Sequence, residues 1–264
     1  MPAPPPPPAA IDAALNARLD EDPMPVVSKA TDYPAGHAIA AHSHPRGQLV
    51  YAEHGVMMVA AEGGRWIVPP TRAIWMPPGV AHAIRCIGVL HMRSVYVRPD
   101  AAPHLPSGAR AVGVSALLRE LVRAAMGVRG PYAPDSRDGR LMRLLLDELH
   151  ALPALPLHLP QPADARLARI CARLVERPDD QATLADWAAE LEVDPKTVQR
   201  LFFRETGMTF GQWRQQARLL HGLERLALGD KVVEVALALG YESPSAFATM
   251  FKRQFGGTPS AFFR

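Results

Sequence analysis

The spacing of apolar residues changes once along the chain, near Pro106. From Val26 to Val97 the apolar residues form short runs rich in Val, Ile, Tyr and Trp, with turn signals at Glu53-His54-Gly55 and Glu62-Gly63-Gly64. Short strands spaced about 8–12 residues apart are typical of a β-sandwich or barrel. The pattern therefore predicts an all-β domain over residues 26–105.

Beyond this point the apolar residues recur at helical spacing. Ser115–Val128 and Arg137–Leu152 each carry an apolar stripe, to which Leu121 and Leu145 belong. We expect these segments to be amphipathic helices of a connector that covers residues 106–158. The connector ends in a stretch rich in proline, which is typical of a linker between domains.

The remaining part, residues 159–264, is helical in pattern and contains an internal duplication. The segments that begin at Leu184 and at Val232 align once one inserted residue, Glu242, is allowed. Each copy predicts a short helix, a turn, and a second helix that opens with a capping residue followed by proline. This is the anatomy of a helix-turn-helix motif, expected twice. The motifs are predicted at about 183–205 and 231–254, with one connecting helix over Thr209–Leu228.

Composition narrows the class of protein. A chain of 264 residues with 48% apolar and 21% charged residues is ordinary for a globular protein of two domains. No apolar run approaches the ~20 residues that span a bilayer, and the start of the chain does not read as a signal peptide. It is a proline tract, so residues 1–25 are expected to be a disordered tail. Two cysteines, Cys86 and Cys171, are too few for a disulfide framework, and we expect a cytoplasmic protein.

Positive charge gathers around the first motif. Between residues 195 and 218 a single acid, Glu205, stands against five basic side chains, Lys196, Arg200, Arg204, Arg214 and Arg218. A basic face beside a helix-turn-helix motif is the electrostatic signature of a nucleic-acid partner.

The last hundred residues resemble the DNA-binding domain of the arabinose-regulator (AraC/XylS) transcription factors. The resemblance rests on LFFRETGMTFGQWRQQARL, on VVEVALALGYESPSAFATMFKRQFGGTPSAFFR, and on their spacing. It implies that bases are read by Lys196, Gln199 and Arg200 on the first recognition helix and by Pro244, Ser245 and Thr249 on the second, whereas Arg204, Lys252 and Arg253 contact phosphates. Glu192 departs from the family, which usually turns through glycine there. The small Ser245 and Thr249 indicate a second helix that positions the protein more than it reads sequence.

The predicted β domain contains three histidines at spacings that suit a shared site. His42 and His44 lie two residues apart on a predicted strand and so share one face, and Pro77-x-Gly79-x2-His82 follows about thirty residues later. With Gly36, Gln48 and Gly55 these residues resemble the two motifs of the cupin barrel. The resemblance implies a metal site of His42, His44, Gln48 and His82, although Gln48 replaces the usual glutamate and Cys86 a frequent asparagine. Such a site suits zinc, nickel, iron or copper. The alternative is that the histidines only line a pocket.

Together these patterns predict a two-domain protein with an N-terminal all-β cupin-like barrel, a helical connector and a C-terminal all-α domain with two helix-turn-helix motifs. The predicted function is a sequence-specific transcriptional regulator whose binding to an operator in double-stranded DNA is modulated by a small molecule or metal in the barrel. The resemblance implies a homodimer formed by the connector helices, which otherwise pack on their own barrel, and RNA polymerase is a further candidate partner.

Two other functions compete with this prediction. One is a cupin-type metalloenzyme fused to a DNA-binding module, which the missing glutamate disfavours. No nucleophile elbow, P-loop or dinucleotide fingerprint occurs either, so no catalytic residue is assigned. The other is an architectural DNA binder with a vestigial barrel, whose DNA binding would not respond to an effector.

Overall fold

The molecule consists of two compact units. The computed structural model describes residues 18–70, 72–155, 157–255 and 257–262. The first unit contains the chain up to Glu62 and Val68–Leu155, and the second contains Gly63–Ile67 and the chain from residue 156 onward. One short segment of the β-rich half therefore belongs to the helical half.

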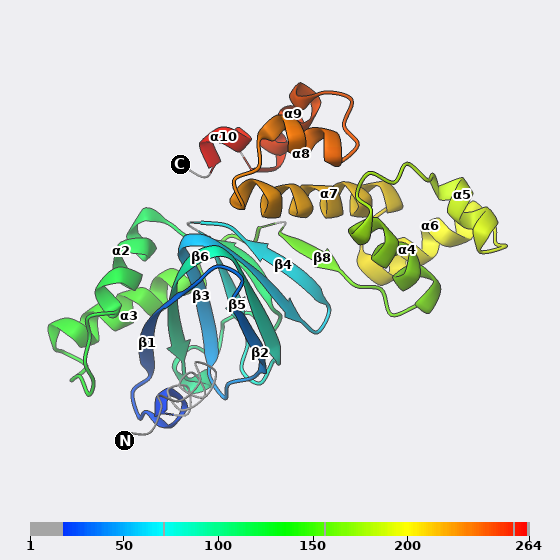
Figure 1. Ribbon diagram of the computed structural model, residues 1–264. Coiled ribbons are helices and arrows are strands. Elements are labelled where there is room, and N and C mark those ends of the chain that lie inside the picture. Colours follow the sequence, from blue (N-terminus) through cyan, green and yellow to red (C-terminus); the bar gives the residue numbers. More distant parts are fainter. Residues whose placement is uncertain (1–17, 71, 156, 256, 263–264) are drawn as a thin grey trace, which may run out of the picture. The chain divides into compact units, whose positions relative to one another are not determined.

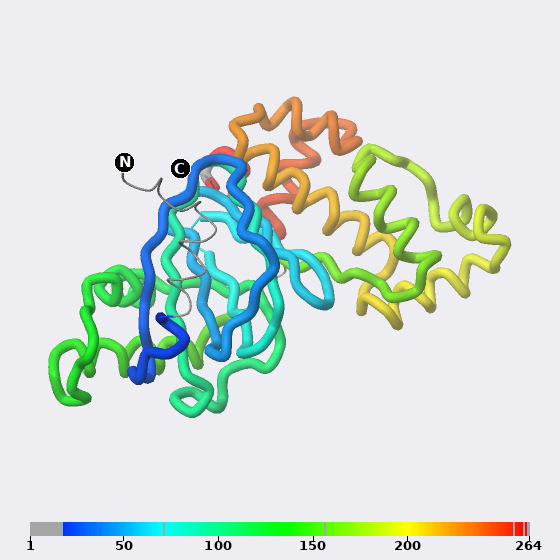
Figure 2. The backbone as a smooth tube through the Cα atoms, turned by 60° about the horizontal axis from the view of Figure 1, so that its bottom comes forward, coloured from blue at the N-terminus to red at the C-terminus, as the bar shows by residue number. Residues whose placement is uncertain are grey.

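A curved antiparallel sheet forms the body of the first unit (Figure 1 and Figure 2). In chain order its strands are β1 (Val26–Tyr33), β2 (Ala38–His42), β3 (Gly47–Ala61), β5 (Arg72–Met76), β6 (His82–Val97) and β7 (Arg110–Gly113). Strand β6 pairs with β1, β2 and β3, and the sheet continues from β3 through β5 to β7. The predicted all-β character of the N-terminal domain is thus confirmed.

A β-bulge replaces one of the two predicted turns. Strand β3 runs unbroken alongside β6, and the pairing register shifts on both sides of His54. Gly55 has a φ of +82°, and a Cβ atom there would lie 2.1 Å from the carbonyl oxygen of Val89. Only glycine fits this combination of left-handed backbone and close approach. The prediction of a turn at Glu53-His54-Gly55 is therefore wrong, because the glycine serves a bulge within one long strand.

Two helices follow the sheet, α2 (Ala116–Ala125) and α3 (Arg137–His150). Both begin at serine caps: Ser115 Oγ accepts a 3.0 Å hydrogen bond from the Leu118 amide, and Ser136 Oγ accepts one of 3.1 Å from the Gly139 amide. The helices of the predicted connector are therefore present, and the first of them starts at the cap that its sequence indicates.

The apolar stripes of α2 and α3 pack on the sheet of the same chain. Leu121 is 8% exposed and Leu145 is fully buried. Both belong to one cluster with Tyr51 and Trp75 of the sheet, and the helices lie beside the sheet in both views (Figure 1 and Figure 2). Of the two alternatives for these stripes, the structure shows packing within the subunit.

The second unit is mainly helical. Its helices are α4 (Ala165–Glu176), α5 (Leu184–Glu190), α6 (Pro195–Thr206), α7 (Phe210–Ala227), α8 (Val232–Ala238), α9 (Pro244–Phe255) and α10 (Pro259–Phe262). The pairs α5–α6 and α8–α9 are the two predicted helix-turn-helix motifs, and they lie toward opposite ends of α7 (Figure 1). Helix α7 has Thr209 and Leu228 as its caps, so the connecting helix has the predicted bounds.

The proline-rich linker contains a strand. Strand β8 (His158–Pro160) pairs with β4 (Gly64–Val68), with Gly64 opposite Pro160 and Trp66 opposite His158. The Trp66 and His158 rings stack with their centroids 4.4 Å apart. The proline-rich segment is therefore not wholly irregular, because three of its residues form a strand.

Candidate DNA interface and metal centre

Both recognition helices start at the predicted residues. The carboxylate of Asp194 accepts a 2.8 Å hydrogen bond from the Lys196 amide, and Ser243 Oγ accepts one of 3.1 Å from the Ala246 amide. A proline follows each cap, where its missing N–H is not needed. The caps set where α6 and α9 begin, and so fix which side chains face outward.

One face of each recognition helix is buried and the other is accessible. Val198 and Phe202 of α6 and Phe247 and Phe251 of α9 are fully buried. The residues predicted to contact DNA lie on the remaining surface, where Lys196, Arg200, Arg204, Ser245, Thr249, Lys252 and Arg253 are exposed and Gln199 and Pro244 are half-buried.

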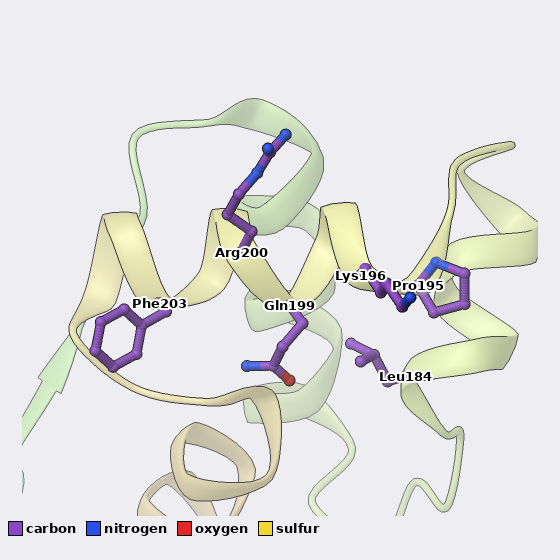
Figure 3. Close-up of a pocket in the computed structure, with 6 residues that line it drawn as sticks. All are labelled: Leu184, Pro195, Lys196, Gln199, Arg200 and Phe203. Carbon is purple, nitrogen blue, oxygen red and sulfur yellow. The ribbon is translucent and has the colours of Figure 1, made fainter.

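A shallow groove runs along the exposed side of α6 (Figure 3). Its lining residues are Leu184, Pro195, Lys196, Gln199, Arg200 and Phe203. Phe203 is 61% exposed and was not among the predicted contacts. Its position, four residues after Gln199 and seven after Lys196, places it on the same helix face, and this spacing could have revealed it.

Two of the five basic residues around the first motif, Arg214 and Arg218, make hydrogen bonds within the protein. Arg214 donates a 3.0 Å hydrogen bond to the carbonyl oxygen of Ala182, and Arg218 donates to those of Pro178 and Asp180 at 2.7 and 3.0 Å. They bind the loop between α4 and α5 to α7. Part of the positive charge predicted for this stretch therefore stabilises the fold.

Glu205 also has a structural task. Its carboxylate accepts hydrogen bonds from the backbone amides of Ala163 and Asp164, at 3.1 and 3.2 Å, just before α4. Arg204 donates to the same carboxylate at 3.0 Å and lowers the pKa of Glu205. Glu205 therefore offsets part of the Arg204 charge, and the phosphate contact of Arg204 stays a prediction.

Three histidines of the first unit lie close together. His42 is directly opposite His82 in the pairing of β2 with β6, and His44 follows two residues later. The ring centroids are 4.4 Å apart for His42 and His82, 5.0 Å for His42 and His44, and 5.9 Å for His44 and His82. One ring nitrogen from each lies within 4.8 Å of the others. These imidazoles can hold a metal ion.

Hydrogen bonds at Nδ1 orient all three rings. Nδ1 of His42 lies 2.8 Å from the carbonyl oxygen of Ala40, and Nδ1 of His82 lies 3.0 Å from that of Val80. Nδ1 of His44 lies 3.3 Å from a carboxylate oxygen of Asp20. Carbonyl and carboxylate oxygens only accept, so each Nδ1 carries the proton and each Nε2 the lone pair.

The lone pairs of the three Nε2 atoms are thus available to bind a metal ion. In His44 and His82 this atom is buried and has no hydrogen-bond partner among the described residues. Burial lowers the pKa of His82 to about 4 and also lowers that of His44, although the Asp20 carboxylate opposes the latter shift. Buried rings that stay neutral at pH 7 are in the form that binds metal.

Gln48 and Cys86 have different surroundings. The Gln48 amide donates hydrogen bonds to Ser94 Oγ and to the Tyr96 hydroxyl, both at 3.1 Å, while its Oε1 is buried without a partner among the described residues. The Tyr96 ring packs edge-on against His44 with centroids 5.1 Å apart. Burial raises the pKa of the Cys86 thiol to about 11, so it stays protonated and is a poor ligand.

Asp20 was missed because it lies within the range expected to be a disordered tail. Residues 1–17 are outside the described part, but residues 18–21 form a turn of helix. Arg46, buried beneath this segment, donates hydrogen bonds to the carbonyl oxygens of Asp22 and Met24. Asp20 carries no motif, and its contact with His44 spans 24 residues of sequence.

Comparison with known proteins assigns each half of the chain to a domain family. A model of the AraC-like ligand-binding domain matches residues 25–152, and a helix-turn-helix domain model matches residues 187–264. The HTH-type transcriptional regulator NimR of Escherichia coli (strain K12) is 34% identical over 221 residues, which are 84% of this chain and 81% of NimR. The regulator RipA of Corynebacterium diphtheriae is 33% identical over 109 residues, 41% of this chain and 32% of RipA. The solved structure of ToxT from Vibrio cholerae aligns with 91% of this chain and 98% of its own at 9% identity, with a TM-score of 0.38.

Proposed function

The chain belongs to the AraC family of helix-turn-helix transcriptional regulators, which join a ligand-binding domain to a DNA-binding domain, and on this premise we propose that a ligand in the first unit controls operator binding by the second. The family consists of regulators rather than enzymes, so the metalloenzyme alternative is set aside. No helix in the described part of the chain is long and apolar enough to cross a membrane. We propose that the protein acts in the cytoplasm, because its proposed partner is DNA.

The first recognition helix supplies the base readers in this proposal. Lys196, Gln199 and Arg200 occupy the accessible side of α6. Arg and Lys recognise guanine and Gln recognises adenine in the major groove. On α9 the accessible Ser245 and Thr249 are short, so this helix positions the protein through Lys252 and Arg253 on the phosphates.

The effector we propose is a transition-metal ion bound by His42, His44 and His82. The observation that carries this proposal is that each Nδ1 is hydrogen-bonded and that one ring nitrogen of each histidine lies within 4.8 Å of the others. Zinc, nickel, iron and copper all accept three imidazoles. Gln48 is the proposed fourth ligand, through its buried Oε1. A small organic molecule in the same barrel is the competing effector.

The outer faces of α2 and α3 are the proposed dimer surface. Leu117 and Leu144 are 48% and 43% exposed, although the stripes beside them are buried. Ser115 at the start of α2 donates a 3.0 Å hydrogen bond to Glu148 near the end of α3, so the two helices run antiparallel. Exposed leucines on a rigid helix pair suit the same surface of a second copy. Contact with RNA polymerase stays a prediction.

Metal content and DNA binding together test the proposed effector. The probe is a duplex that the full-length protein enriches from a random-sequence library, with binding measured by fluorescence anisotropy. We expect close to one metal ion per chain in protein purified without chelator. Chelation with EDTA, or His42→Ala with His44→Ala, should remove the ion and change the affinity for the duplex.

A second pair of histidines provides the matched control. The rings of His54 and His91 lie 5.3 Å apart, and neither belongs to the candidate metal site. His54→Ala with His91→Ala should keep both the metal and the response to EDTA. Wild-type protein that contains no metal, and whose DNA binding ignores added zinc, nickel, iron and copper, would contradict the metal proposal and favour an organic effector.

A further inference from the structure

We propose that Phe203 reads DNA as well, by packing its ring against the 5-methyl group of a thymine in the major groove; this rests on the proposed function. Phe203 is 61% exposed, whereas Phe202 beside it is fully buried in the same helix. Phe202 thus fills the core of the motif, and Phe203 has no such role. An exposed phenyl ring in a groove that also contains cationic side chains fits an apolar group carried by a polyanion.

The neighbours of Phe203 indicate which apolar group this is. Phe203 lines the groove together with Lys196, Gln199 and Arg200. Gln199 and Phe203 project to the same side of α6, away from Arg200 (Figure 3). In the major groove the thymine methyl is the apolar group that the bases offer, and Phe is among the side chains that contact it.

The spacing along the helix sets the expected register. Gln199 and Phe203 are four residues apart, which is about 6 Å along the axis of α6. Successive base pairs are about 3.4 Å apart, so this distance covers roughly two base pairs. If Gln199 binds an adenine, the thymine contacted by Phe203 lies within about two base pairs of it. The half-site read by α6 is therefore expected to contain an A·T pair at this position.

Replacing thymine with deoxyuridine tests the contact directly, because only the methyl group is removed. The probe is the duplex enriched from a random library by the full-length protein, prepared with each thymine replaced in turn. At one or two positions the replacement should weaken wild-type binding about threefold to fivefold, as expected for one buried methyl group. Phe203→Ala should bind the thymine and deoxyuridine duplexes equally, and Phe203→Leu should keep part of the difference.

Leu237 of α8 supplies the control, since it is 59% exposed and lies outside the groove. Leu237→Ala should retain the full response to thymine methyl groups. Phe203→Ala should unfold at the same temperature as the wild type, because its ring is not part of the core. A Phe203→Ala variant that still distinguishes thymine from deoxyuridine would overturn the inference and turn attention to a protein partner for this ring. Failure to enrich any sequence would instead overturn the proposed function, and this inference with it.

Discussion

The indole nitrogen of Trp213 donates a 2.8 Å hydrogen bond to the backbone carbonyl oxygen of Pro160. Trp213 lies in α7 and is fully buried. Nearly one helical turn later, the side-chain amide of Gln216 donates a 3.3 Å hydrogen bond to the backbone carbonyl oxygen of His158. Two side chains of α7 therefore hold both ends of β8, so the segment that enters the second unit is fixed to its central helix.

Removing the indole N–H should destabilise the second unit. We expect Trp213→Phe to lower its free energy of unfolding by about 1–3 kcal/mol beyond the loss of ring volume, because a buried carbonyl is left without its donor. Trp187→Phe is the matched control, since Trp187 is equally buried but its Nε1 has no hydrogen-bond partner among the described residues. Urea unfolding followed by helical circular dichroism measures both. Equal losses in the two variants would show that the hydrogen bond adds nothing.

The turn of the first motif is strained at Glu192, whose φ is +54°. A left-handed backbone costs a residue with a side chain roughly 1–2 kcal/mol, whereas glycine adopts it without this cost. Glycine also makes the unfolded chain more flexible, which lowers the free energy of unfolding by about 0.4–1 kcal/mol. Glu192→Gly should therefore stabilise the protein by about 0.5–1 kcal/mol, seen as a higher urea midpoint. Gly240, its counterpart in the second motif, has a φ of +72° and a Cβ atom there would meet Gln181 at 2.5 Å. Gly240→Ala should destabilise; a gain from that change would refute the comparison.

Asp20 should strengthen metal binding by orienting His44. Loss of the partner that orients a metal-binding histidine typically weakens affinity about 10–100-fold. We expect this loss for Asp20→Ala in calorimetric titrations with zinc. Asp20→Asn should lose less, because its amide oxygen still accepts from Nδ1. Glu21→Ala, an exposed neighbour, should bind zinc as the wild type does. Unchanged affinity in Asp20→Ala would mean that His44 is held in place by its packing alone.

Charge on the outer face of the helix pair should break the proposed dimer. Leu117→Glu with Leu144→Glu is expected to yield folded monomers in sedimentation experiments, because both side chains are exposed in the subunit. Leu145→Glu should instead unfold the first unit, since that side chain lies in the core. Dimers that persist in the Leu117 and Leu144 double variant would place the interface elsewhere.

Two arginines of α6 should have different roles in DNA binding. Arg200→Ala is expected to cost about 1–3 kcal/mol and to relax the preference at one base pair. Arg204→Ala should weaken binding similarly on all sequences and reduce the salt dependence by about one charge. Arg214→Ala serves as a third case: it should destabilise the fold, because this side chain holds the carbonyl of Ala182. Identical effects of the first two changes on selected and random duplexes would contradict the division of roles.

Local sequence was enough to predict the helices of the second unit. Caps such as Asp194 and Thr209 depend on amides two or three residues away, so their effect can be read along the chain. The features that sequence missed depend on distant partners. Strand β8 exists because His158 and Trp66 pair, and the contact of Asp20 with His44 forms only when the sheet is folded. The burial of Leu121 and Leu145 likewise required knowing which surface covers an apolar stripe.

Strand β4 makes the second unit discontinuous in sequence, because two separate segments of the chain form it. A fragment that begins at residue 159 would leave behind His158, and with it one of the two anchors of β8, as well as every residue of β4. We therefore expect a fragment cut at that point to be less stable than one that keeps both strands. A chimera that gives this protein a new sensor is likewise expected to be more stable when it carries a strand equivalent to β4.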